Sequence, residues 1–182
     1  MPNKDFGWGK LNLGDMTDPV CTVTAPNGGE VLQVAASANL TWTASDLVGV
    51  TGVDIEFSRN NGGSWENIAL GVSNTGSYPW TVIGPVTTSA LLRVTARDAA
   101  GNSGNDLSNA VWAINRPPVC SGAAASEAVL WPPNHQYRAI SIDGVTDPDG
   151  DPVTITVTGI TQDEPVKGRG DGNTCPDALF TQ

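Results

Sequence analysis

The sequence is poor in the side chains that catalysis and metal binding use most often. It holds one histidine, His135, and three cysteines in 182 residues. A Ser-His-Asp arrangement would need that histidine, yet His135 lies in a proline-rich turn and the chain has no Gly-x-Ser-x-Gly nucleophile segment. The cysteines and the histidine also lack the spacing of a closed zinc site. We therefore predict that this chain is not an enzyme.

Charges and long apolar runs are scarce as well. Charged residues make up 15% of the chain, and their balance gives a net charge of −10. Nucleic-acid phosphates require neutralising Lys and Arg, so we expect no nucleic-acid partner. No apolar run approaches the ~20 residues that cross a bilayer, so we expect no membrane insertion. The surplus of carboxylates fits cation binding or simple solubility.

The chain is rich in the patterns of short strands and turns. Apolar and polar residues alternate in three runs, at residues 40–44, 53–58 and 92–97. A period of two places each apolar set on one face of a sheet. Clusters of Asn, Gly and Pro separate the runs, and no segment keeps a 3.6-residue period. The sequence therefore predicts an all-β fold, with a two-sheet β-sandwich over residues 19–115.

Three motifs in this segment carry a family resemblance: Thr24–Glu30 (Thr-Ala-Pro-Asn-Gly-Gly-Glu), Leu40-Thr41-Trp42 and Val53–Ser58. Together they resemble a fibronectin-III/immunoglobulin-like module of the kind that recurs in secreted bacterial proteins. The resemblance implies that Trp42 is the buried core tryptophan of the sandwich. It also implies a secreted or cell-surface location.

Residues 116–182 are predicted to form a second module after a stiff, proline-rich linker. The Trp131–His135 segment, the Asp147–Pro152 hairpin and the Gly170–Asp177 stretch resemble those of a bacterial surface-protein module. Residues 116–182 are too few for a complete sandwich of this kind. We therefore expect two immunoglobulin/fibronectin-III-like modules in tandem, with the second lacking its final strands.

The first residues carry a separate resemblance. Residues 2–15 contain an Asn/Asp-rich turn and the step Gly7-Trp8-Gly9-Lys10, and they resemble the end of the catalytic domain of subtilisin-like serine proteases. Residues 1–18 would then be the tail of a protease domain and a linker. The N-terminus lacks the apolar segment of a signal peptide, so we expect an excised fragment, an internal start or a wrongly placed gene start.

Asp147, Asp149 and Asp151 place three carboxylates on one short loop. Calcium prefers about six to eight hard oxygen ligands, which alternate Asp residues can supply. The segment resembles the Asp-x-Asp-Gly-Asp turns of cadherin-like repeats, which implies a calcium site, with Asp163 and Asp171 as further candidate ligands. The alternative is an Asp-Gly hairpin turn that holds no cation.

Asp46 and Asp98 form a second candidate cation pair. In an immunoglobulin-like sandwich the loops that follow them share one pole, so the two carboxylates could lie close together. The alternative is that each carboxylate caps its own loop.

Residues 58–65 match an Asp-box, Ser-x-Asp/Asn-x-Gly-x-Ser/Thr-Trp. We expect Ser58 and Asn60 to bond to the hairpin backbone, Gly62 to allow the turn, and Trp65 to pack beneath it. Because one copy cannot build a propeller of several blades, we interpret this segment as a structural hairpin.

Cys21, Cys120 and Cys175 form an odd set, so at most one internal disulfide is possible. Cys120 and Cys175 both lie in the second module, and we expect them to pair and to leave Cys21 free or intermolecular. The competing outcome is that Cys120 pairs with a cysteine in the missing strands.

These patterns favour a non-catalytic extracellular accessory region of a secreted subtilisin-like protease, which acts as a spacer, a stabiliser or a binding module. Its partner would be the preceding protease domain, or a cell-surface or polymeric substrate. One alternative is a structural or adhesive cell-surface protein of tandem modules. Another is a carbohydrate-binding module that stacks sugars on exposed tryptophans, for which the strand candidates are Trp42, Trp65, Trp80 and Trp112.

Overall fold

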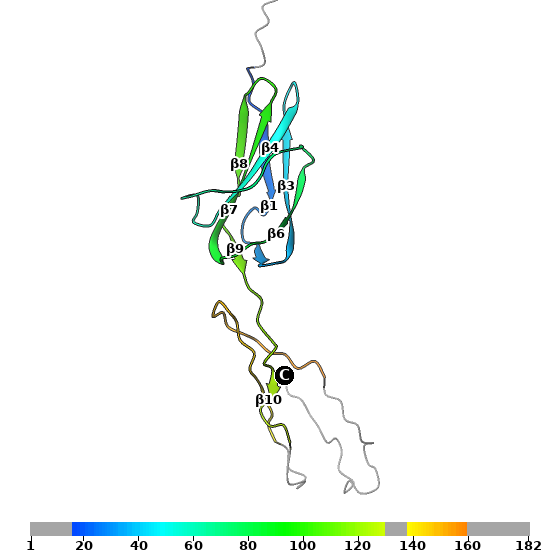
Figure 1. Ribbon diagram of the computed structural model, residues 1–182, viewed down its shortest axis with the longest axis vertical. Coiled ribbons are helices and arrows are strands. Elements are labelled where there is room, and N and C mark those ends of the chain that lie inside the picture. The colour runs from blue at the N-terminus through cyan, green and yellow to red at the C-terminus, as the bar shows by residue number, and fades with distance from the viewer. Residues whose placement is uncertain (1–15, 130–137, 160–182) are drawn as a thin grey trace, which may run out of the picture. The chain divides into compact units, whose positions relative to one another are not determined.

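The computed structural model describes residues 16–129 and 138–159, and the chain divides into two compact units between Asn115 and Arg116. In the described parts every regular element is a β-strand, as predicted (Figure 1). Several predicted features lie outside the described residues: the tail at residues 2–15, His135, Asp163, Asp171 and Cys175. None of the described segments forms a helix long and apolar enough to span a membrane.

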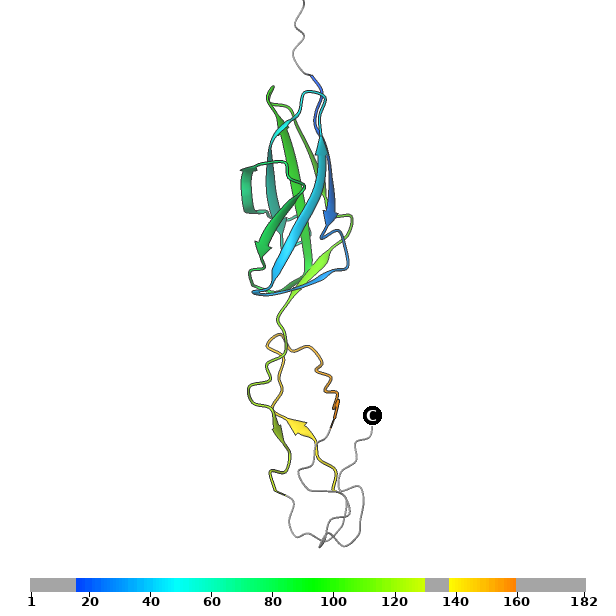
Figure 2. The ribbon, with the colours of Figure 1, turned by 90° about the vertical axis from the view of Figure 1, so that its right-hand side faces the viewer.

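The first unit is a sandwich of two sheets (Figures 1 and 2). One sheet is antiparallel, with the strand order β1 (Val20–Ala25), β3 (Ser37–Ser45) and β6 (Ser77–Thr81). The other has the order β2 (Val31–Gln33), β9 (Trp112–Asn115), β7 (Thr87–Asp98), β4 (Val50–Ser58) and β5 (Glu66–Val72). The first half of the long strand β7 pairs with β9, and its second half pairs with β8 (Ser103–Leu107). The β2–β9 pair is parallel, and the other strand pairs of this unit are antiparallel.

The core lies where the alternating runs predicted it. From the three runs, the buried side chains are Leu40, Trp42, Val53, Ile55, Phe57, Leu92, Val94 and Ala96. Trp80, from β6, contacts Phe57 and Trp112 across the sandwich, with ring centroids 5.2 and 6.3 Å away. Because Trp80 belongs to one sheet and its two partners to the other, this aromatic cluster joins the sheets. Trp42 is buried as expected, and its Nε1 donates to Asn74 Oδ1 at 3.0 Å.

One edge of the sandwich is closed by contacts between β1 and β8. The backbone N–H of Val23 donates to Asp106 Oδ2 at 2.8 Å, which links the two sheets. A Cβ at position 104 would collide with the carbonyl oxygen of Pro19. The close approach of β8 to the segment before β1 therefore requires Gly104. At the other edge of the small sheet, β6 contains Pro79, a residue that sheets accept at their edges.

The described part of the second unit has little regular structure. Its strands β10 (Ala124–Ala125) and β11 (Ile142–Asp143) pair, and Val119 forms a bridge with Thr146. None of its described side chains is buried, and the apolar Ile155 remains 45% exposed. The described part of this unit therefore holds no buried core, and the incomplete second module stays a prediction.

Candidate functional site

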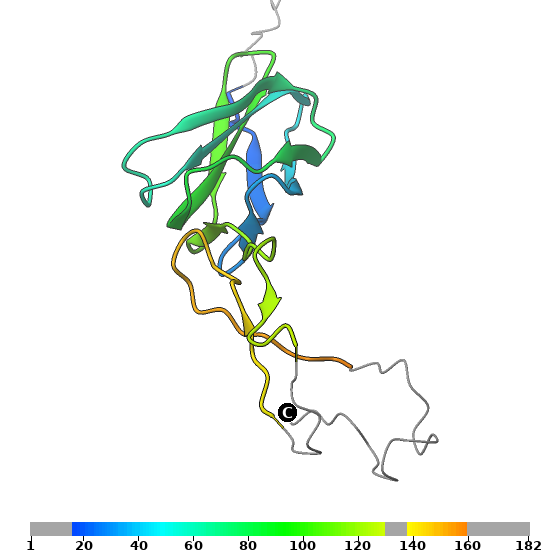
Figure 3. The same ribbon diagram turned by 60° about the horizontal axis from the view of Figure 1, so that its bottom comes forward.

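The hairpin loop between β4 and β5 holds the Asp-box-like residues and stands out from the sandwich (Figure 3). Ser58 is buried, and its Oγ accepts hydrogen bonds from the backbone N–H groups of Asn60 and Gly62 at 3.3 and 2.9 Å. Asn60 Oδ1 accepts from Ser58 Oγ at 2.9 Å and from Ser64 N at 2.8 Å. Asn61 and Gly62 have φ values of 54° and 87°, a conformation that Asn and Gly adopt most readily. These contacts hold the loop in one conformation.

Trp65 is half-buried beside this loop, directly before β5. The guanidinium carbon of Arg93 lies 4.2 Å from its ring centroid, and Arg93 Nε donates to Glu56 Oε2 at 2.8 Å. The other described tryptophans are buried: Trp42, Trp80 and Trp112. The described residues therefore offer no row of exposed indoles, which the carbohydrate-binding alternative requires, and Arg93 covers one face of Trp65.

Arg59 anchors the same hairpin, a structural role that the sequence did not predict. Its guanidinium donates to the carbonyl oxygens of residues 83–85 at 2.5–3.0 Å and to Glu66 Oε1 at 3.0 Å. Its guanidinium carbon lies 4.5 Å from the ring centroid of Phe57. No sequence pattern marks this role, because the acceptors are backbone carbonyl groups about two dozen positions away. Arg59 is the variable middle residue of the Ser58-x-Asn60 pattern, and that pattern does not specify an arginine there.

Asp46 and Asp98 lie in loops at the same end of the sandwich, since β4 begins opposite the end of β7. Asp46 Oδ2 accepts the N–H groups of residues 48–49 at 2.8 and 3.1 Å. Asp98 accepts from Asn102 N at 2.8 Å and from Asn102 Nδ2 at 2.7 Å. Each carboxylate thus caps its own loop. Across the described chain, no three His, Cys, Asp or Glu residues are grouped so as to hold a metal ion.

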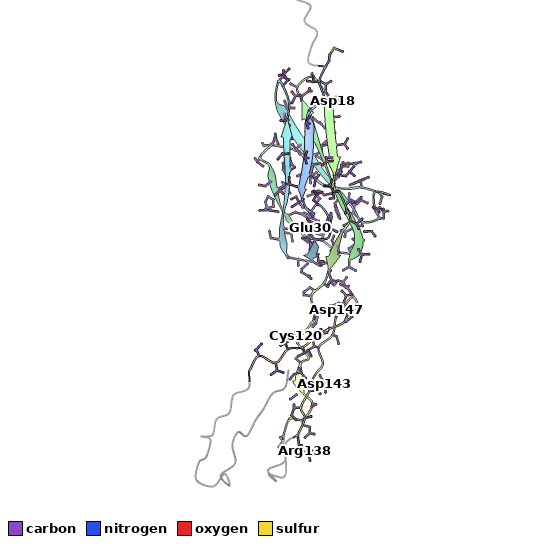
Figure 4. All side chains as sticks on the ribbon, turned by 180° about the vertical axis from the view of Figure 1, so that it is seen from behind. Asp18, Glu30, Cys120, Arg138, Asp143 and Asp147 are labelled. Carbon is purple, nitrogen blue, oxygen red and sulfur yellow. The ribbon has the colours of Figure 1, made fainter. Side chains whose placement is uncertain are left out.

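The acidic loop of the second unit also bonds to its own backbone (Figure 4 labels Asp147). Asp147 Oδ1 accepts the N–H groups of Asp149 and Asp151 at 2.8 and 3.3 Å. Asp149 Oδ2 accepts the N–H of Arg116 at 2.8 Å, and its Oδ1 lies 3.6 Å from the Arg116 guanidinium. Gly150, with φ 82°, closes the turn. Asp163 and Asp171 lie outside the described residues, so the calcium site stays a prediction.

Calcium titration of the full chain tests that prediction. If Asp147, Asp149 and Asp151 bind a cation together, Asp149→Asn should weaken calcium binding roughly tenfold or more, because affinity follows the number of charged ligands. Asp143→Asn is the matched control, since Asp143 lies in the same unit, in β11, away from the acidic loop. Calorimetry at constant ionic strength is the measurement. Equal binding of magnesium and calcium, or no binding at millimolar calcium, would show that the segment is only a turn.

The two described cysteines have different surroundings. Burial, and after it the nearby charge of Asp106, raises the pKa of the Cys21 thiol from 9.0 to about 11. Cys120 is exposed, and its predicted partner Cys175 lies outside the described residues. The disulfide between Cys120 and Cys175 therefore stays a prediction.

Alkylation rates of the reduced, folded chain should separate these two thiols. A rise of two pKa units lowers the thiolate fraction of Cys21 about a hundredfold at neutral pH, so Cys21 should react far more slowly than Cys120 with iodoacetamide. The same shift favours the folded state below pH 9, and this contribution is lost as the pH rises towards 11. Mass spectrometry of both thiols gives the rates. In urea the two alkylation rates should converge. Equal rates in the folded chain would contradict the burial of Cys21 and its raised pKa.

A known protein family matches most of the first unit. Residues 19–96 match the family described as Bacterial Ig domain. The matched segment covers less than half of the chain and ends inside β7. The sandwich of the first unit continues beyond it, through β8 and β9. No curated protein matches the chain.

Among solved structures, this chain is similar to the fibronectin(III)-like modules of Clostridium thermocellum CbhA. The two share 22% sequence identity with a TM-score of 0.40, over 53% of this chain and 45% of that chain. The chain thus spans less than half of the length of that structure. The family match supports an immunoglobulin-like sandwich for the first unit.

Proposed function

We propose that this chain is a non-catalytic accessory region of an extracellular bacterial protein, and that it spaces, stabilises or presents a neighbouring domain. The match of residues 19–96 to a bacterial Ig domain family is the observation that carries this proposal. Such domains are typically non-catalytic and extracellular. The net charge of −10 fits this role, because it keeps a secreted module soluble and well separated from nucleic acids.

The finer proposal names a subtilisin-like protease as the neighbouring domain. It rests on the resemblance of residues 2–15 to the end of such a catalytic domain, in a segment outside the described residues. In this arrangement the sandwich follows the protease directly. It would hold the enzyme away from a surface, or bring it to a cell-envelope or polymeric substrate.

The second candidate is a structural or adhesive surface protein of tandem modules with no protease. Its support is the same family match, together with the division of the chain into two successive units. The two candidates differ in what precedes the first module.

The DNA upstream of the codon for Met1 distinguishes the two candidates. An in-frame segment that encodes Gly-Thr-Ser-Met-Ala, the nucleophile segment of subtilisin-like proteases, is the expected result for the protease proposal. A signal-peptide sequence at that place contradicts it and favours the surface protein.

A further inference from the structure

We propose that Asn61, in the hairpin loop between β4 and β5, is a site of spontaneous deamidation, which converts it to aspartate or isoaspartate. The chain contains two Asn-Gly-Gly segments, at residues 27–29 and 61–63, so the same local sequence occurs in two surroundings. The structure leaves Asn61 open to the reaction and clamps Asn27 against it. This inference goes beyond the proposed function and does not rest on it.

The reaction joins the Asn side chain to the next peptide group. The backbone nitrogen of the following residue loses its proton and attacks the side-chain amide carbon. Ammonia leaves, and a cyclic imide remains. Water then opens the imide at either of its carbonyl groups, which gives aspartate or isoaspartate. Glycine after the Asn favours the attack, because it has no side chain in the way and allows the peptide group to turn.

At the hairpin loop the reacting groups are held weakly. Asn61 is exposed, and its side-chain amide has no hydrogen-bond partner among the described residues. The reacting nitrogen belongs to Gly62, and it donates to the uncharged Ser58 Oγ at 2.9 Å. The backbone N–H of Asn61 donates to Ser89 O at 2.8 Å, but this group takes no part in the reaction. Solvent therefore reaches the amide, and a bond between uncharged groups holds the nitrogen.

Both reacting groups of Asn27 and Gly28 are held by stronger contacts. Asn27 Oδ1 accepts the backbone N–H of Asn109 at 2.7 Å, and Gly28 N donates to Glu30 Oε2 at 2.6 Å. Glu30 Oε1 accepts the N–H of Asn27 at 2.7 Å, while the Asn27 carbonyl accepts from Ala110 N at 3.2 Å. Bonds to an ionised carboxylate are about twice as strong as those between neutral groups. The amide carbon thus cannot turn towards Gly28 N without the loss of several bonds.

The Glu30 carboxylate keeps its charge under the conditions of the reaction. Burial would raise the pKa of the Glu30 carboxyl, but the backbone N–H groups of Asn27, Glu30 and Gly28 together hold it below its usual value. Glu30 is therefore ionised at mildly alkaline pH, where deamidation is fast. A carboxylate beside Gly28 N suits two opposite roles, a clamp and a base that removes the proton. The geometry favours the clamp, because the same carboxylate holds two successive N–H groups and Asn109 holds the amide oxygen.

Deamidation would change the hairpin loop itself. Isoaspartate places one more carbon atom in the backbone at position 61. Three bonds span this position: Gly62 N to Ser58 Oγ, Gly63 N to Asn60 O at 3.2 Å, and Ser64 N to Asn60 Oδ1. The longer loop cannot keep all three, so it loosens. Arg59 precedes the altered position, and its bonds to residues 83–85 remain.

The test follows the folded full chain at mildly alkaline pH by peptide mapping and mass spectrometry, with aspartate and isoaspartate separated by chromatography. Asn61 should deamidate about tenfold faster than Asn27 or more, since each bond that must open slows the reaction. In urea the two rates should converge, because the local sequences are the same. Asn67 is the internal control: it is exposed but precedes Ile68, and it should stay unmodified. Equal rates at Asn61 and Asn27 in the folded chain, a faster rate at Asn27, or a rate at Asn67 as high as at Asn61 would overturn the proposal.

Glu30→Gln gives an independent arm, because it keeps the shape of the side chain and removes its charge. If Glu30 is a clamp, Asn27 should deamidate about tenfold faster in this variant while the rate at Asn61 stays the same. A slower reaction at Asn27 would show that Glu30 acts as a base and would overturn the clamp. The comparison of Asn61 with Asn27 in the unaltered chain needs no substitution, so it decides the proposal even if Glu30→Gln does not fold.

Discussion

Replacing Arg59 with alanine should lower the free energy of unfolding of the first unit by roughly 2–4 kcal/mol. The side chain is only 13% exposed and binds three backbone carbonyl groups and Glu66 while it covers the ring of Phe57. Its removal leaves those carbonyl groups without their charged donor and releases the segment at residues 83–85 from the hairpin. Urea denaturation of the full chain, followed by tryptophan fluorescence, gives the change.

Arg97 provides the matched control for Arg59. It forms an ion pair with Asp54 at 2.6 Å on the same sheet, but its side chain is 54% exposed. Because exposed ion pairs contribute little, Arg97→Ala should cost less than about 1 kcal/mol. Arg59→Lys should lose most of what Arg59→Ala loses, since a lysine cannot bind several acceptors in one plane. Equal effects of the Arg59 and Arg97 substitutions would contradict the anchoring role.

Replacing Phe57 with alanine should have the largest effect, a loss of about 3–5 kcal/mol in the free energy of unfolding. Phe57 is buried, and its ring contacts Trp80 from the opposite sheet, so its removal opens a cavity in the layer that joins the sheets. For a unit of this size, the melting temperature should fall by roughly 12 °C or more. Circular dichroism during heating measures the shift.

Leu70→Ala is the control for Phe57→Ala, because Leu70 lies on the edge strand β5 and is 60% exposed. Its effect should stay within about 0.5 kcal/mol. A small effect at Phe57 together with a large one at Leu70 would mean that the sheets pack through other faces.

Strands whose two faces differ in polarity could be predicted from the sequence alone. The runs at residues 40–44, 53–58 and 92–97 alternate because one face is buried and the other is in water. The buried Leu40, Val53 and Leu92 confirm this pattern. The Asp-box pattern was equally informative, since the hydrogen bonds of Ser58 and Asn60 are local and follow from the spacing of the residues.

Pairings between distant segments could not be predicted in the same way. β2 is three residues long and shows no alternation, and its parallel partner β9 lies about eighty positions later. The roles of Arg59 and Asp106 depend on backbone groups that the fold brings close, so their neighbours in sequence give no sign of them. For the acidic loop the residue types allow both a cation site and a turn. The described contacts of Asp147 are those of a turn, whereas the Asp149 carboxylate binds the backbone N–H of Arg116 and lies beside its guanidinium.

The central claim, that this chain is a folded β module without catalysis, is tested most directly by a hydrolysis assay on the folded full chain. Circular dichroism first establishes that the sample contains β-sheet. The chain is then incubated with casein and with small peptide esters, in the presence and absence of serine-protease inhibitors. The account predicts no hydrolysis above the buffer control. Hydrolysis that persists in the inhibitor control for contaminating proteases and disappears in His135→Ala would contradict it.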